Sequence, residues 1–68
     1  MSKALADFVK QARKTYGLSQ TDLAEKTGLG MRFVRDLEQN KHTVRVDKAD
    51  QLLSLFGKRL GIVDLERD

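Results

Sequence analysis

The chain must fold without any covalent cross-link, because none of its 68 residues is a cysteine. A chain of this length buries only about 60% of the surface that it exposes when unfolded, so its single core is marginal. Small domains usually add disulfides, a metal or a partner subunit. The missing cysteines exclude disulfides and thiolate metal sites, and the single histidine, His42, excludes a histidine-based metal site within one chain. We expect no cofactor and no metal. Oligomerisation is therefore the expected extra source of stability.

The sequence contains no sign of export or membrane insertion. No apolar run approaches the roughly 20 residues of a membrane helix. The first residues include Lys3 and Asp7 in place of the apolar core of a signal peptide. The lack of cysteine also suits a reducing compartment. We therefore expect a cytoplasmic protein that does not contact membranes.

Positive charge is concentrated in the first two thirds of the chain. Residues 1–45 hold nine Lys or Arg against five Asp or Glu, whereas residues 46–68 hold four against five. The net charge of the whole chain is +3. Residues 1–45 could therefore face a polyanion, although many solvated helical proteins show a similar asymmetry.

Apolar residues repeat with helical spacing in four stretches, which predicts four helices over residues 5–16, 19–28, 30–39 and 46–56. Gly17 and Gly57 follow the first and fourth stretches and Gly28 ends the second, and glycine is the residue preferred at the end of a helix. Asn40 can take the same left-handed turn after the third. We therefore expect a mainly α fold in which residues 1–57 form one domain.

The second predicted helix has the strongest start signal. Ser19 can cap it, and Asp22 stands three residues later as a shortened capping box. Leu23, Val34 and Leu37 would then hold the second and third helices against the first and fourth. Two short capped helices joined by a glycine-containing turn are the arrangement that a helix-turn-helix requires.

Residues 58–65 differ from the rest because they are rich in strand formers, and we predict a short strand there. A lone strand is unstable, and the chain offers no second one. We expect residues 58–68 to serve dimerisation, with this strand pairing antiparallel to the same strand of a second copy. The expected dimer contacts are Leu60, Ile62, Val63 and Leu65.

Residues 18–41 resemble the Cro and phage-repressor class of helix-turn-helix proteins, the XRE family. The matching positions are Leu18-Ser19-Gln20, Leu23-Ala24, Gly28, Val34, Leu37-Glu38 and Lys41. The resemblance implies a lambda-repressor-like bundle of four helices that binds double-stranded DNA at an inverted-repeat operator as a homodimer.

A finer resemblance continues to the end of the fourth predicted helix. The segments 33–41, 43–48 and 52–57 are similar to HipB-like antitoxins, which accompany HipA-like kinase toxins. This resemblance implies a repressor of its own operon that acts as the antitoxin of a toxin–antitoxin pair. A stand-alone regulator without a toxin is the alternative, and an interaction module that has lost DNA binding is a third.

The third predicted helix carries the candidate base contacts. Helical steps of 100° place Phe33, Val34 and Leu37 on one side and Met31, Arg32 and Arg35 opposite. In this architecture the start of the second motif helix enters the major groove, where arginine reads guanine O6 and N7. Met31 could touch a thymine methyl, and Gly30 could allow close approach of the backbone. Asp36 could accept from cytosine or orient an arginine. The candidate base contacts are therefore Gly30, Met31, Arg32, Arg35 and Asp36.

Candidate phosphate contacts flank this helix. Gln20 stands at the start of the second helix, where a helix amino end favours a phosphate. The family resemblance implies that the segment after the third helix also contacts the DNA backbone. The candidate set is Ser19, Gln20, Lys41, Thr43 and Arg45.

Each candidate also has a plain structural explanation. Arg32 and Arg35 could be solvated helix positions, and Lys41 and Arg45 could serve solubility alone. Phe8 and Tyr16 are expected in the core. No serine has a histidine and an orienting acid beside it in a pattern typical of a nucleophile, so we do not expect an enzyme.

Overall fold

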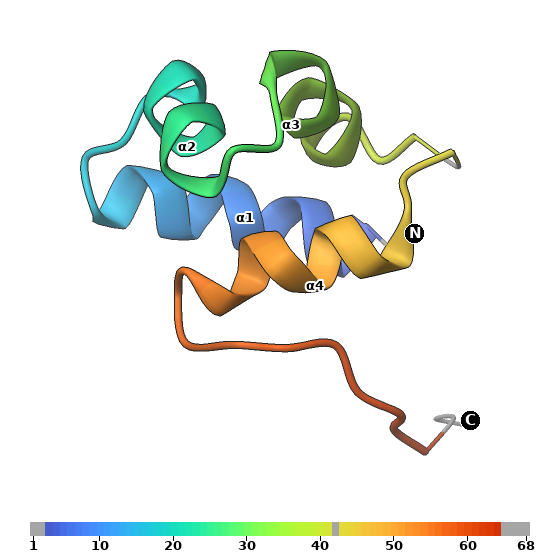
Figure 1. Ribbon diagram of the computed structural model, residues 1–68. Coiled ribbons are helices and arrows are strands. Elements are labelled where there is room, and N and C mark those ends of the chain that lie inside the picture. The colour runs from blue at the N-terminus through green and yellow to red at the C-terminus, as the bar shows by residue number, and fades with distance from the viewer. Residues whose placement is uncertain (1–2, 42, 65–68) are drawn as a thin grey trace.

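The structure, a computed structural model, describes residues 3–41 and 43–64. In this part of the chain four helices follow one another (Figure 1): α1 (Lys3–Thr15), α2 (Gln20–Thr27), α3 (Met31–Glu38) and α4 (Val46–Ser54). The four predicted helices are confirmed, with ends that differ by one or two residues. No described helix is both long enough and apolar enough to cross a membrane.

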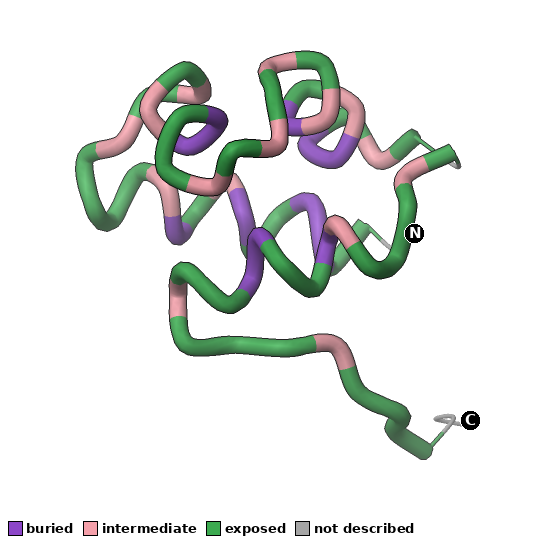
Figure 2. Tube along the Cα trace, in the orientation of Figure 1, coloured by how far each residue is buried: buried purple, intermediate pink, exposed green. Residues whose placement is uncertain are grey.

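The helices form two layers with the core between them. In Figure 1, α2 and α3 lie together on one side of α1 and α4, and the chain after α4 runs along the opposite side. The buried segments of all four helices turn toward the space between the layers (Figure 2). The largest fully buried side chains are Val9, Leu23, Val34, Leu37 and Leu52. The prediction that Leu23, Val34 and Leu37 lock the helix-turn-helix onto the rest of the bundle is confirmed.

Helix α3 ends in a left-handed turn at Asn40, as predicted. Asn40 has φ +59°, and the N–H of Lys41 donates to the carbonyl of Asp36 at 3.0 Å. The N–H of Asn40 donates to the carbonyl of Leu37 at 3.1 Å. This hydrogen-bond pair is the Schellman arrangement, which satisfies carbonyls that a helix end leaves without partners. Asparagine tolerates the left-handed region better than most residues, so it replaces glycine here.

The predicted strand is not formed over residues 58–64, and Leu65 lies outside the described residues. The N–H of Lys58 instead donates to the carbonyl of Leu53 at 3.0 Å, and the N–H of Leu60 donates to Asp50 Oδ1 at 2.8 Å. Ile62 and Val63 are exposed. A single chain offers this segment no strand to pair with, so its first backbone groups bond to α4.

The prediction that Phe8 and Tyr16 belong to the core is wrong. Tyr16 is 67% exposed and Phe8 is also classed as exposed. The Tyr16 ring stacks on Phe56, with centroids 5.6 Å apart and planes 24° from parallel. Phe8 meets the same Phe56 ring edge-on at 6.3 Å. Helical spacing places both residues toward α4, but they lie at the margin of the α1–α4 contact, where solvent reaches them.

Candidate nucleic-acid interface

A local hydrogen-bond pattern fixes the start of α2. Ser19 Oγ accepts the N–H of Asp22 at 3.0 Å, and Asp22 Oδ2 accepts the N–H of Ser19 at 2.9 Å, which confirms the predicted capping box. The backbone and side-chain hydrogen bonds with Ser19, aided by the charge of Lys26, hold the pKa of Asp22 below its ordinary 3.8. The Ser19 oxygen, a candidate phosphate contact, is therefore already engaged as an acceptor within the chain.

The turn between α2 and α3 depends on two glycines with positive φ. Gly28 ends α2 at φ +70° and donates its N–H to the carbonyl of Ala24 at 2.9 Å. Gly30 precedes α3 at φ +84° and ψ +157°, a region that is essentially restricted to glycine. The sequence suggested that Gly30 lets DNA approach. The structure adds a conformational reason for glycine at this position, because the backbone there is one that side-chain-bearing residues rarely adopt.

A buried ion pair ties three helices together, and the sequence analysis missed it. Arg13 Nε donates to Glu38 Oε2 at 2.9 Å, and its Nη2 donates to Glu38 Oε1 at 3.2 Å. The side chain of Glu38 is only 4% exposed. Arg13 Nη1 also donates to the carbonyl of Leu18 at 3.0 Å, and Gln20 Nε2 donates to Glu38 Oε1 at 3.2 Å. These bonds join α1, the α1–α2 turn, α2 and α3 into one rigid unit.

A sequence signal for this pair was present. Glu38 follows the buried Val34 by four residues, and Arg13 follows the buried Val9 by four. Each charge therefore occupies the apolar stripe of its helix. Opposite charges on two buried stripes indicate a buried ion pair. The same pair explains Gln20, whose amide nitrogen is directed to Glu38. The first backbone N–H groups of α2 could still bind an anion, because they have no acceptor within a helix.

Helix α3 presents its two arginines to solvent, as predicted. The side chain of Arg32 is 96% exposed, and Arg35 is exposed as well. Arg32 Nε lies 3.9 Å from Asp36 Oδ2, one helical turn further on. The sequence suggested two roles for Asp36, contact with cytosine or orientation of an arginine. Its position beside Arg32 fits the second role. Exposed pairs of this kind are weak, so Arg32 can exchange this partner for another at little cost.

Met31 lies differently from expectation. It is half-buried and packs against the core instead of projecting from α3 opposite to Val34. Met31 precedes Val34 by three residues, which puts it only about 60° from that buried position on a helical wheel. The first turn of α3 therefore faces solvent mainly through Arg32.

The connection from α3 to α4 carries the other predicted phosphate contacts. Lys41 and Thr43 are exposed, and His42 between them lies outside the described residues. Arg45 donates from Nη2 to Asp47 Oδ2 at 2.8 Å and from Nε to Asp47 Oδ1 at 3.1 Å. Desolvation raises the pKa of Asp47, but the hydrogen bond and charge of Arg45, together with backbone hydrogen bonds from Lys48 and Asp47 itself, leave that pKa lowered. Arg45 therefore has an exposed ion-pair partner at the start of α4, which, like that of Arg32, it can exchange at little cost.

One groove joins the predicted base and phosphate contacts. It runs between α3 and the connection to α4, and its lining is Leu29, Arg32, Phe33, Asp36, Thr43, Val44, Arg45 and Lys48. Three cations therefore face a single groove beside the exposed side of α3. Leu60, Ile62 and Val63, the predicted dimerisation residues that the structure describes, lie elsewhere, since residues 58–64 run on the opposite side of the molecule in Figure 1.

Two short helices joined by a glycine turn, with arginines exposed on the second helix, define a helix-turn-helix protein of the DNA-binding type. Residues 9–63 match the family Helix-turn-helix, and the chain belongs to this family. A relative from Sinorhizobium fredii (strain NBRC 101917 / NGR234), an uncharacterized HTH-type transcriptional regulator, is 38% identical over 56 residues. The alignment covers 82% of this chain and 74% of the relative. Among solved structures no significant match was found. The class is that of DNA-binding transcriptional regulators rather than of enzymes.

Proposed function

We propose that this protein is a sequence-specific repressor that binds an inverted-repeat operator as a homodimer. By occupying the operator, it blocks RNA polymerase. One observation supports this most. Arg32 and Arg35 project from α3, while Val34 and Leu37 fix the same helix in the core. An arginine on a rigid helix can read guanine bidentately in the major groove.

The groove beside α3 supports a division of labour between base and phosphate contacts. Thr43, Arg45 and the neighbouring Lys48 line it together with Arg32. Lys41 and the N-terminal turn of α2, with Ser19 and Gln20, would hold the DNA backbone on either side. Phosphate contacts of this kind position a protein on DNA, whereas base contacts give it specificity. Gly30, Met31 and Asp36 would complete the base-contacting set, with Met31 contributing only the part of its side chain that remains exposed.

The homodimer follows from the symmetry of such operators. Two recognition helices must stand about one DNA turn, roughly 34 Å, apart to enter successive major grooves. The exposed apolar residues Ile62 and Val63, with Leu60 and Leu65 on either side, are the proposed dimer contacts. A small core without disulfides gains stability from such an interface.

Two arginine variants test the function. We expect Arg32→Ala and Arg35→Ala each to weaken operator binding by about 1–3 kcal/mol and to relax discrimination at one base pair. Binding of operator and scrambled duplexes is measured by fluorescence anisotropy over a range of salt concentrations. Lys10→Ala is the control, because it removes the same charge from α1. Both arginine variants binding the operator as tightly as wild type would rule out α3 as the reading helix.

The finer role as an antitoxin rests on the resemblance of residues 33–57 to HipB-like antitoxins. Under this proposal the protein also binds a HipA-like kinase encoded beside it, through a surface that DNA leaves free. Co-purification with the product of a neighbouring kinase-like gene tests the proposal. A neighbourhood without such a gene would favour the stand-alone regulator.

A further inference from the structure

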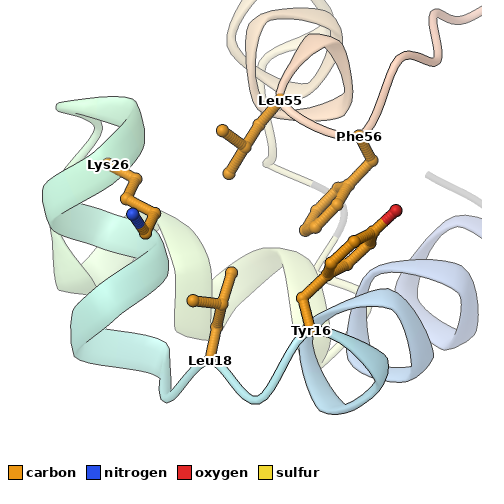
Figure 3. A pocket seen from close by; sticks show the side chains of 5 residues that line it. All are labelled: Tyr16, Leu18, Lys26, Leu55 and Phe56. Atoms are coloured by element: carbon orange, nitrogen blue, oxygen red, sulfur yellow. The ribbon is translucent and has the colours of Figure 1, made fainter.

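An apolar groove lies between the ends of α1 and α4 and the side of α2. We call it the aromatic groove, and its lining is Tyr16, Leu18, Lys26, Leu55 and Phe56. In Figure 3 the stacked rings of Tyr16 and Phe56 form one wall, Leu18 and Leu55 stand on either side, and Lys26 faces them from α2. Four of the five side chains are largely apolar, and one carries a positive charge.

The proposed DNA contacts do not use this groove. None of its residues belongs to α3 or to the connection between α3 and α4, which carry Arg32, Arg35 and Arg45. Tyr16 and Leu55 are nevertheless exposed. When another apolar group covers an aromatic stack with leucines around it, the burial of apolar surface lowers the free energy of the complex.

The C-terminal segment carries a matching set of side chains. Ile62 and Val63 are exposed apolar residues, and the acidic Asp64 follows them directly. In an extended segment Ile62 and Asp64 point to the same side, about 7 Å apart. An aliphatic side chain could therefore enter the apolar part of the aromatic groove while the carboxylate approaches the Lys26 ammonium.

The segment cannot easily reach the aromatic groove of its own chain. The N–H of Leu60 is bound to Asp50 of α4, five residues before Leu55, which directly follows that helix. The chain after Gly57 therefore runs back along α4, away from Leu55 and Phe56, and Figure 1 shows this course beneath the helix. If the segment comes from a second copy, both chains can keep their observed conformation.

We propose that the segment 62–64 of one copy docks in the aromatic groove of the other, with Ile62 against Leu18, Leu55 and Phe56 and Asp64 beside Lys26. The exchange is reciprocal, so a two-fold dimer closes on itself and leaves no groove empty. This inference rests on the proposed homodimer and names the surface that receives the C-terminal segment.

Cysteine cross-linking tests the docking directly, because the sequence contains no cysteine of its own. A Leu18→Cys chain is mixed with an Ile62→Cys chain under mild oxidation, and covalent dimers are resolved on a non-reducing gel. We expect a mixed disulfide between the two chains. The control pairs Ile62→Cys with Glu25→Cys, an exposed position of α2 that does not line the groove, and should give little product. Rapid self-linking of Ile62→Cys alone, without the mixed product, would mean that the segments pair with each other and would overturn the docking.

A charge exchange provides a second test that needs no oxidation. Lys26→Glu and Asp64→Lys should each weaken dimerisation in the absence of DNA by about fivefold, the combined size of the two exposed ion pairs that the two-fold dimer would lose. The double variant should recover most of that loss. Sedimentation equilibrium measures the dimer constant, and circular dichroism checks that each variant is folded. Dimerisation unchanged by both single variants would overturn the docking and leave the homodimer intact. A wild-type chain that stays monomeric would refute the homodimer itself.

Discussion

Glu38 is the only buried polar or charged residue of the described chain. It receives three side-chain hydrogen bonds, two from Arg13 and one from Gln20. A buried charge is tolerated only when it is paired and hydrogen-bonded, and removing one partner leaves the other uncompensated. Glu38 also belongs to α3, the helix that carries Arg32 and Arg35. This one carboxylate therefore links the stability of the bundle to the placement of α3, the proposed reading helix.

Replacing Glu38 should be costly for folding. We expect Glu38→Ala to lower the free energy of unfolding by about 3 kcal/mol, because Arg13 loses its charge partner while it remains partly buried. That is a large fraction of the stability of a domain this size. Urea unfolding followed by circular dichroism measures the change. Glu25→Ala, at an exposed site of α2, should stay within about 0.5 kcal/mol of wild type. Equal effects of the two variants would show that the pair contributes nothing to stability.

At the scale of elements, the turn between α2 and α3 sets the angle at which the reading helix leaves the motif. Leu29 of this turn packs against the core, and the two glycines on either side of it supply backbone conformations that glycine adopts freely. Gly28 and Gly30 both have positive φ, and a Cβ at either one would meet no atom within 4 Å. Any penalty of substitution must therefore come from backbone strain rather than from a clash.

Gly30→Ala isolates that strain. We expect it to destabilise the fold by about 1–3 kcal/mol, because alanine must either adopt the glycine conformation or shift the start of α3. Gly61→Ala is the control, since its added Cβ is equally unhindered and its φ is not in the left-handed range. Thermal unfolding compares the two. An equally small effect at both positions would show that the turn adapts without cost.

The cap of α2 should make stability depend on pH. The pKa of Asp22 is lowered in the folded chain, first by its hydrogen bonds with Ser19. Its carboxylate therefore contributes stability above its ordinary pKa of 3.8, and this contribution disappears as the pH falls through the lowered folded value. We expect wild type to exceed Asp22→Asn in stability at neutral pH and the difference to close below pH 3.8. Urea unfolding between pH 7 and about 3 measures it. If the stability difference between wild type and Asp22→Asn stayed constant with pH, the contribution of the cap would not depend on the charge of Asp22.

At the scale of the whole molecule, the proposed reading helix α3 and the C-terminal segment proposed to reach a second copy lie on different sides of the bundle. The α2–α3 pair is on one side of the bundle and the C-terminal segment is on the other (Figure 1). The rigid core between them would transmit the geometry of the dimer to the two reading helices. Operator affinity should therefore depend on residues that never touch DNA.

Ile62→Lys tests this dependence. The residue is fully exposed in the single chain, so the fold itself should be unaffected. A lysine would carry a charge into the dimer interface, and we expect a lower dimer fraction in light scattering and weaker operator binding. The added positive charge would by itself strengthen DNA binding, so a loss cannot be electrostatic. Lys58→Ala with Arg59→Ala measures how much the charge of this segment contributes. An unchanged dimer fraction would place the interface away from Ile62.

The sequence by itself determined the helices and their ends. Ser19 with Asp22, Gly28 and Asn40 act on backbone groups within a few residues of themselves, so their effects can be read without knowing the fold. The same locality explains why α3 could be recognised as the helix with an exposed arginine face. Helical periodicity alone places Arg32 and Arg35 away from Val34 and Leu37.

Only the tertiary structure decided how side chains distant in sequence meet. The bond between Arg13 and Glu38 spans 25 residues, and Gln20, for which the sequence suggested a phosphate contact, also bonds to Glu38. Tyr16 has core-like spacing but lies at the margin where α1 meets α4, and Met31 lies near enough to Val34 to be half-buried. The course of residues 58–64 was equally unpredictable, because Leu60 bonds to Asp50 in the absence of a strand partner. Burial depends on which helices meet and at what angle, and no local pattern of residues encodes that angle.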